Sequence, residues 1–257
     1  RPRCCAVAES EGGTVRGSAA GWLGAMCRVP GKRILEWALI LPFAAPAYVI
    51  AYAYTDFLQH PGPVQTWLRA VTGWGPRDYW FPEIRSRGAA VLVLSVALAP
   101  YVYLLTRAAF REQSGGVYEV AQALGAGHWG RFRRVGLPLA RPAIAAGAAL
   151  GMLETVNDFG VVDFFAVQTL TTGIFSVWLE GGNTGGAAQI ATVILLLILV
   201  LMGLEKAGRR GMKFFNPPRH SRPVTPQRLT GLAGWAATLA CTLPFALGFA
   251  LPVGVIA

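Results

Sequence analysis

The run AAQIATVILLLILVLMGL at residues 187–204 contains no charged side chain and is long enough to cross a lipid bilayer as a helix. Such a helix needs roughly 20 mostly apolar residues, because the hydrocarbon core is about 30 Å thick. Similar runs occur at residues 34–54, 88–106, 142–164 and 231–257, and the run 142–164 is unusual because it carries acidic residues. The sequence therefore predicts an all-α protein, a polytopic bundle of about five membrane-spanning helices.

Composition and charge support a membrane protein. The 257 residues are 54% hydrophobic and 14% charged, with a mean hydropathy of +0.45, which is not the balance of an ordinary soluble domain. The net charge of +10 would suggest nucleic-acid binding in a soluble protein, but here the basic residues gather in alternate loops. By the positive-inside rule, loops 1–33, 107–141 and 205–228 face the cytoplasm, whereas loops 55–87 and 168–186 lie outside. We therefore expect a multi-pass protein in the lipid bilayer and no nucleic-acid partner.

The runs and loops divide the chain into four parts. Residues 1–33 are expected to be a poorly defined cytoplasmic segment, since their first part lacks both helical periodicity and the apolar core of a signal peptide. Residues 34–204 form a four-span domain with a cytoplasmic loop at 107–141. Residues 205–228 combine basic side chains with prolines, a composition typical of linkers. Residues 229–257 would then begin a second domain. Because the chain starts at Arg1 without Met and stops at Ala257 inside an apolar run, it is expected to be incomplete at both ends.

The outer loop 55–87 is rich in aromatic residues and prolines, among them Trp67, Trp74 and Trp80. Because Trp and Tyr concentrate at membrane interfaces, this loop can be an aromatic belt. It can also be a docking surface for an extracytoplasmic partner protein. Composition alone does not separate the two interpretations.

The cytoplasmic loop contains the stretch EVAQALGAGHWGRFRRVGLPLARP, residues 119–142. Its apolar residues recur at helical spacing and predict two short helices, one before Gly125 and Gly127 and one that ends at Pro138. The apolar residues of the first helix are Val120, Ala121 and Leu124, and those of the second are Trp129, Phe132 and Val135. A basic loop held at the anionic lipid surface is the alternative interpretation.

This stretch resembles the cytoplasmic loop of the binding-protein-dependent ABC importer permeases with a type I transmembrane domain. Their loop has the pattern EAA, three residues, Gly, nine residues, Ile, one residue and Leu-Pro. The matching residues here are Glu119, Val120, Ala121, Gly125, Val135, Leu137 and Pro138. Val120 and Val135 are conservative departures from the pattern, and the spacing agrees throughout.

The resemblance implies a fold and a set of partners. In that family the loop inserts as a coupling helix into a cleft of a separate cytoplasmic ABC ATPase, which binds ATP and magnesium, and an extracytoplasmic binding protein delivers the substrate. The residues implied in coupling are Glu119, Ala121, Leu124, Gly125, Val135, Leu137 and Pro138. The chain lacks a GxxxxGKS/T phosphate loop, so we expect a transport subunit of the bacterial inner membrane with no cofactor or enzymatic site of its own.

Further strings resemble the ferric-iron permeases of that family, and the resemblance extends from about residue 26 to 257. They are PAYVIAYAYTDFLQ (46–59), DYWFPEIRS (78–86), LPLARPAIAAG (137–147) and ETVNDFGVVDFFAVQTLTTGIF (154–175). Such permeases typically fuse two halves in one chain, which fits a linker followed by a new apolar run. The resemblance implies ferric iron as the substrate. Thiamine, a polyamine, a phosphonate or an inorganic anion are the alternatives, because the loop pattern is common to importers of all of them.

The run 142–164 contains Glu154, Asn157, Asp158 and Asp163, and acidic side chains are costly in hydrocarbon. Glu154 and Asp158 are one helical turn apart and would share a face, where they could line a translocation path for a cation. Alternatively, the helix ends near Glu154 and the acids lie at the outer interface, or they pair with an arginine. Direct ligation of iron by these oxygen ligands is a further hypothesis.

Two other classes of function would use the same residues. An intramembrane enzyme would need Glu154 and Asp158 for acid–base chemistry, but no histidine or nucleophile accompanies them in sequence. A passive channel would need the polar path but no coupling loop. A bulky acidic residue in place of Gly125 would abolish ATPase association and uptake in an importer and leave a channel unaffected.

Overall fold

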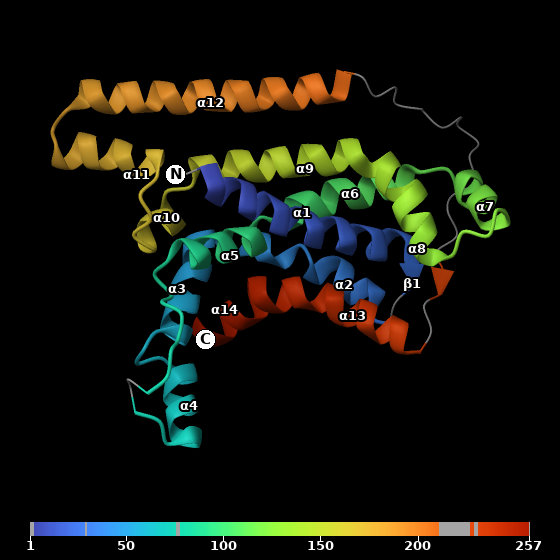
Figure 1. Cartoon of the computed structure of the whole chain (residues 1–257), viewed down its shortest axis with the longest axis horizontal. Coiled ribbons are helices and arrows are strands. Elements are labelled where there is room, and N and C mark those ends of the chain that lie inside the picture. The colour runs from blue at the N-terminus through green and yellow to red at the C-terminus, as the bar shows by residue number, and fades with distance from the viewer. Residues whose placement is uncertain (1–2, 29, 76–77, 211–226, 229–230, 257) are drawn as a thin grey trace.

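The computed structural model of the chain describes residues 3–28, 30–75, 78–210, 227–228 and 231–256, and it is almost entirely helical there (Figure 1). As far as Glu112 the elements are α1 (Arg3–Met26), β1 (Cys27–Arg28), α2 (Lys32–Ala38), the 3-10 helix η1 (Leu41–Ala44), α3 (Ala47–Leu58), α4 (Pro63–Thr72), α5 (Arg87–Ala97) and α6 (Ala99–Glu112). They are followed by α7 (Gly115–Ala123), α8 (His128–Arg131), the π-helix η2 (Phe132–Gly136), α9 (Leu137–Asn157), α10 (Gly160–Phe164), α11 (Leu170–Phe175), the π-helix η3 (Ser176–Glu180), α12 (Thr184–Arg210), β2 (Gln227–Arg228), α13 (Leu232–Phe245), the π-helix η4 (Ala246–Ala250) and α14 (Leu251–Ile256). β1 and β2 form one short parallel pair, and the all-α prediction is confirmed.

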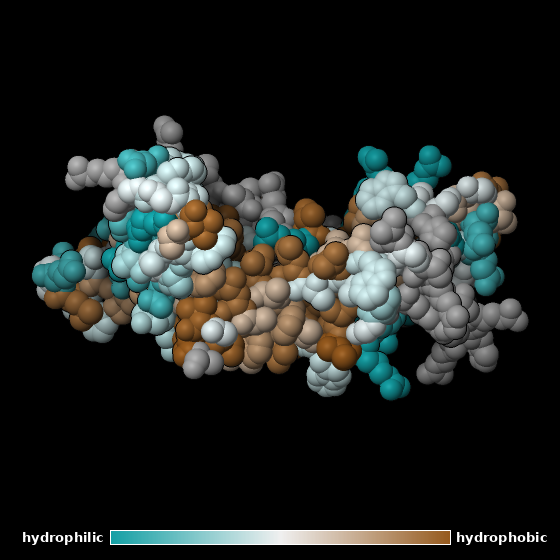
Figure 2. All heavy atoms as spheres, turned by 90° about the horizontal axis from the view of Figure 1, so that it is seen from below, coloured by the Kyte–Doolittle hydropathy of each residue, from teal (hydrophilic) through white to brown (hydrophobic). Residues whose placement is uncertain are grey.

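Four helical segments of the described chain are long and apolar enough to cross a membrane, and they run along the long axis of the molecule (Figure 1). They are Arg87–Glu112, Trp129–Asn157, Thr184–Ala207 and Gly234–Ile256. Three of them overlap predicted runs closely, whereas Trp129–Asn157 begins and ends before the predicted run 142–164. Apolar side chains cover the middle of the face that α13 and α14 form, and hydrophilic ones gather toward its two ends (Figure 2). This arrangement is expected of a surface that faces a bilayer.

The predicted run 34–54 is broken rather than straight. The helical segments Lys32–Ala44 and Ala47–Thr72 meet at an angle of 93°. Proline causes the break, because Pro46 has no N–H to donate and Ala45 before it is extended, with φ −103° and ψ 121°. If the bent pair counts as one span, the described chain has up to five.

The structure differs from the expectation that residues 1–33 are poorly defined. The 24-residue helix α1 runs parallel to α6 through the middle of the bundle (Figure 1). Glycines permit this approach, since a Cβ at Gly21 would lie only 2.3 Å from Thr106 Oγ1. In membranes, small residues bring helices together without an apolar driving force, so hydropathy does not reveal α1. A helix that follows α6 along the bundle also does not fit a wholly cytoplasmic segment.

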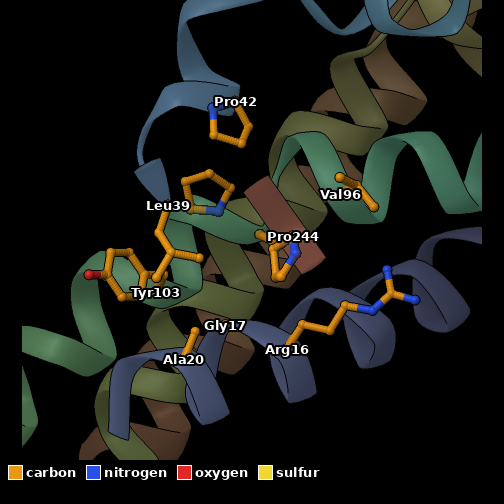
Figure 3. A pocket seen from close by; sticks show the side chains of 10 residues that line it. Arg16, Gly17, Ala20, Leu39, Pro42, Val96, Tyr103 and Pro244 are labelled. Atoms are coloured by element: carbon orange, nitrogen blue, oxygen red, sulfur yellow. The ribbon is translucent and has the colours of Figure 1, made fainter. Parts of the chain in front are cut away.

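The last described helices pack against the rest of the bundle. The hydroxyl of Tyr54 in α3 donates a hydrogen bond of 2.8 Å to the carbonyl oxygen of Leu247. Pro42, Pro100 and Pro244 come from three different elements and line one small cavity (Figure 3). α13 and α14 therefore belong to the same packed unit as α3 and α6.

Most of the predicted linker 205–228 lies outside the described residues, which stop at 210 and resume at 227. The prediction that residues 229–257 begin a second domain stays a prediction.

Candidate functional site

The predicted pair of short helices is present at one end of the bundle, as α7 and α8 (Figure 1). α7 is capped by Leu124, and the chain reverses at Gly125, which has a positive φ of 80°. A residue with a Cβ is strained in this conformation, so the turn depends on glycine. The N–H of Gly125 donates to Gln122 O at 2.9 Å, and that of Ala126 donates to Ala121 O at 3.0 Å. The predicted helix break at Gly125 is confirmed.

The second short helix does not end at Pro138, contrary to the prediction. α8, η2 and α9 follow one another without a gap and form one helical segment up to Asn157. The wider π-helical turn absorbs the proline, because the N–H of Leu137 donates to Phe132 O, five residues back. α8 is therefore connected to the span α9 by continuous helical backbone.

Trp22 of α1 packs against aromatic rings from three other elements. Its ring centroid lies 5.2 Å from that of Phe110, 5.9 Å from that of Tyr118 and 5.0 Å from that of Phe132. Such contacts contribute about 0.5–1.5 kcal/mol each beyond the area they bury. Gly136 leaves room for the indole, since a Cβ there would lie 2.3 Å from it. Trp22 thus ties α6, α7 and η2 to α1, a role that sequence analysis missed because it placed this residue in a poorly defined segment.

Hydrogen bonds hold α7 against the continuous helical segment that α8, η2 and α9 form. Buried Arg131 donates from Nη1 to Gln122 Oε1 at 3.0 Å. The hydroxyl of Tyr118 donates to Gln113 Oε1, and Gln113 Nε2 donates to the carbonyl oxygen of Gly136 at 3.3 Å. Burial raises the pKa of Tyr118, so its hydroxyl stays protonated and keeps its donor role at physiological pH. The two helices form a rigid module with the start of α9.

The outer surface of this module exposes three large apolar side chains. Val120, Leu124 and Trp129 are 61%, 82% and 70% exposed, and Glu119 next to Val120 is also exposed. We call these four residues the α7–α8 surface. The remaining predicted coupling residues with side chains are partly buried, and they are Ala121, Val135, Leu137 and Pro138. The predicted coupling residues therefore include both exposed residues and residues that pack inside the module.

The four predicted path residues do not form one cluster. α9 ends at Asn157, and Asp158 has left the helix with φ −66° and ψ 130°. Its carboxylate Oδ2 accepts hydrogen bonds from the N–H groups of Val161 and Val162, at 3.1 and 3.2 Å, at the start of α10. Asp158 therefore caps a helix, and the prediction that it shares a helical face with Glu154 is wrong.

Glu154 is exposed and is held by a residue from the middle of another span. The hydroxyl of Tyr101 in α6 donates to Glu154 Oε1 at 3.4 Å, and the Tyr101 ring packs edge-on against Phe43 with 4.6 Å between centroids. Among the described residues the structure records one ion pair, between Arg107 and Glu36, so no arginine neutralises Glu154 there. Glu154 lies about one turn before the end of the span Trp129–Asn157, and its place on a translocation path stays a prediction.

Asn157, the last residue of α9, and Asp163 in α10 are both exposed. Within the described ranges, no three His, Cys, Asp or Glu side chains come together in a way that could hold a metal ion. The hypothesis of direct iron ligation therefore finds no support in the geometry. The same separation of Glu154 from Asp158 argues against an acid–base pair.

The profile of the family described as "Binding-protein-dependent transport system inner membrane component" matches residues 17–213. The chain belongs to this family. The permease is 27% identical over 207 residues to the molybdenum transport system permease protein ModB of Escherichia coli K12, covering 73% of this chain and 86% of ModB. It is 29% identical over 193 residues to the sulfate transport system permease protein CysT of the same organism, covering 73% and 67%.

A solved structure supports the same fold. A chain of a bacterial alginate ABC transporter, crystallised with an alginate pentasaccharide-bound periplasmic protein, matches with a TM-score of 0.63 at 18% identity. The match covers 80% of this permease and 76% of that chain. The protein is thus an inner-membrane permease of the ABC importer kind, and its resemblance to ferric-iron permeases is not confirmed by these relatives.

Asp158→Ala is expected to destabilise the permease by about 0.5–2 kcal/mol, because two N–H groups at the start of α10 lose their acceptor. Asp163→Ala is the matched control on the same short helix, and its exposed side chain should change stability by less than about 0.5 kcal/mol. Thermal unfolding in detergent measures both. Equal stabilities of the two variants would show that Asp158 is no cap.

Proposed function

We propose that the α7–α8 surface docks onto a separate cytoplasmic ATPase and passes its ATP-driven motion to the spans. The observation that carries this proposal is the exposure of Val120, Leu124 and Trp129 on a module continuous with α9. Apolar side chains this exposed outside the membrane mark an interaction site. Trp22 extends the rigid connection to α1, so two long helices would move with the module. ATP and magnesium would be bound by the partner and not by this chain.

The proposed substrate is ferric iron, delivered by an extracytoplasmic binding protein. The strings at 46–59, 78–86, 137–147 and 154–175 resemble ferric-iron permeases and support this choice. The charge of Glu154 supports it independently, because an exposed carboxylate attracts a cation and the described residues place no basic partner beside this one. Glu154, rather than Asp158, is then the acidic residue of the proposed path, with Asn157 and Asp163 nearer its outer end.

An inorganic oxyanion is the second candidate, because two relatives are named for molybdenum and sulfate transport. Glu154 would repel an anion at short range. Oxyanion import would therefore require that this carboxylate be protonated or lie away from the path.

An uptake assay separates ferric iron from an oxyanion as the substrate. It uses vesicles that contain the permease, its ATPase and the cognate binding protein. We expect ATP-dependent accumulation of radioactive ferric iron that excess molybdate and sulfate do not reduce. Accumulation of molybdate or sulfate without iron would establish the oxyanion instead. Accumulation that persists without ATP would contradict the importer proposal and favour a channel.

A further inference from the structure

The helix α4 (Pro63–Thr72) lies across the bundle rather than along it. The segment Ala47–Thr72, which ends with α4, turns by 93° from the direction of Lys32–Ala44. In Figure 1, α4 projects sideways at the end of the bundle opposite α7 and α8, level with the start of α5 and the end of α14. The charge of the loops places this end outside the cytoplasm. α4 thus runs parallel to the plane of the membrane near its outer surface.

Few contacts inside the protein support α4. It packs mainly on α3, and Gln65 is its one buried side chain, donating to Leu58 O at 2.8 Å and accepting from the Tyr79 hydroxyl at 2.8 Å. Isolated helices shorter than about 12–15 residues are marginal in water, and α4 has 10. α4 therefore depends on contacts beyond its own hydrogen bonds to stay folded.

The side of α4 away from Gln65 is an apolar stripe. Trp67 and Val71 are one turn apart and are 66% and 65% exposed. Trp74 follows the helix, and its ring stacks on that of Tyr79 with 6.0 Å between centroids, so it is not part of the stripe. The stripe carries no charge. The one charged residue of α4, Arg69, donates to the carbonyl oxygen of His60 at 2.9 Å and contacts the His60 ring.

We infer that α4 is an interfacial anchor whose partner is the outer leaflet of the bilayer, with Trp67 and Val71 inserted among the lipid headgroups. An in-plane helix with a tryptophan on its apolar face and a polar face has the properties of such anchors. A protein partner is less favoured, because the stripe offers it no charge and no hydrogen-bonding group other than an indole N–H. The anchor fixes the outer end of α3, whose Tyr54 is bonded to Leu247 near the end of the described chain. This inference does not depend on the transported substrate.

Spin labels on the two sides of α4 test the inference. Cysteine replaces Trp67 in one variant and Thr72 in the other, in a permease whose four natural cysteines are replaced by serine. Thr72 is exposed and lies about 140° around the helix from Trp67, which makes it the matched control. The labelled permease with its ATPase is placed in vesicles of phosphatidylethanolamine and phosphatidylglycerol. Collisions of each label with oxygen and with a water-soluble nickel chelate are then measured.

The label at residue 67 is expected to collide with oxygen several-fold more than with nickel, at a depth of about 5–10 Å, and the label at 72 to do the reverse. A label at 67 that nickel reaches freely until the binding protein is added would show a protein-docking surface and overturn the inference. A label at 67 that neither reagent reaches would show that another part of the transporter covers α4, and would overturn it as well. If Trp67→Cys does not fold, Val71→Cys reports on the same stripe.

Discussion

Leu124→Asp is expected to abolish substrate uptake and to release the ATPase, while the permease stays folded. Leu124 is 82% exposed at the end of α7, so the charge should cost at most about 0.5 kcal/mol of folding free energy. Within an apolar interface the same change costs about 2 kcal/mol or more, which is roughly 30-fold or more in affinity. Co-purification of the ATPase with the permease measures the first effect, and ATP-dependent uptake by vesicles measures the second.

Leu124→Met is the matched control, because it keeps an apolar side chain of similar volume at the same position. It should retain both the complex and uptake. If Leu124→Asp co-purifies with a normal amount of ATPase, docking occurs elsewhere and the proposal for the α7–α8 surface is wrong. If Leu124→Asp elutes as an aggregate in detergent, Val120→Asp is tested instead, because it changes the same exposed surface.

The short helix α7 and the turn at Gly125 could be predicted from sequence because their signals are local. Gly125 marks the turn through its own backbone conformation, and the helical spacing of Val120 and Leu124 places them on one face. The helix continues through Pro138 by means of a π-helical turn that begins at Phe132. Local sequence signals do not distinguish such a turn from a helix end. Local patterns thus predicted the short helices and the turn between them. The continuity of α8 with the span α9 was visible only in the structure.

α1 shows why hydropathy finds only some helices of this bundle. Its contacts with α6 are made by glycines such as Gly17 and Gly21, where Val102 and Thr106 occupy the space that a side chain would fill. Such a helix contributes close packing rather than apolar surface, so it resembles a loop in composition. Without α1, the role of Trp22 in joining α7 to α6 could not be foreseen.

The acidic residues of the third predicted run show a second limit of sequence reasoning. Four-residue spacing places Glu154 and Asp158 on one face only if the helix continues through both. The structure ends the helix at Asn157 and turns Asp158 onto the backbone of α10. One carboxylate therefore stabilises a turn, and the other is left exposed beside Tyr101.

Glu154→Gln is expected to lower the rate of ferric-iron uptake by about 10- to 100-fold without loss of the ATPase, because the change keeps the shape of the side chain and removes its charge. Interactions with a charged group are worth about 1.5–3 kcal/mol, which corresponds to that range. Initial uptake rates in vesicles at saturating ATP measure the effect. An oxyanion substrate would give the opposite sign, since the loss of a like charge would ease its passage.

Tyr101→Phe tests whether the position of this carboxylate matters, and Tyr103→Phe is its matched control. Both changes remove one hydroxyl from α6, but the hydroxyl of Tyr103 is buried with no hydrogen-bond partner among the described residues. Tyr101→Phe should reduce uptake less than Glu154→Gln, because 3.4 Å is long for a hydrogen bond, and Tyr103→Phe should not reduce it. Since the two groups act through one contact, the double variant should match Glu154→Gln alone. If the losses of uptake caused by the two changes add in the double variant, Tyr101 acts independently of Glu154. Normal uptake by Glu154→Gln would exclude this carboxylate from the path.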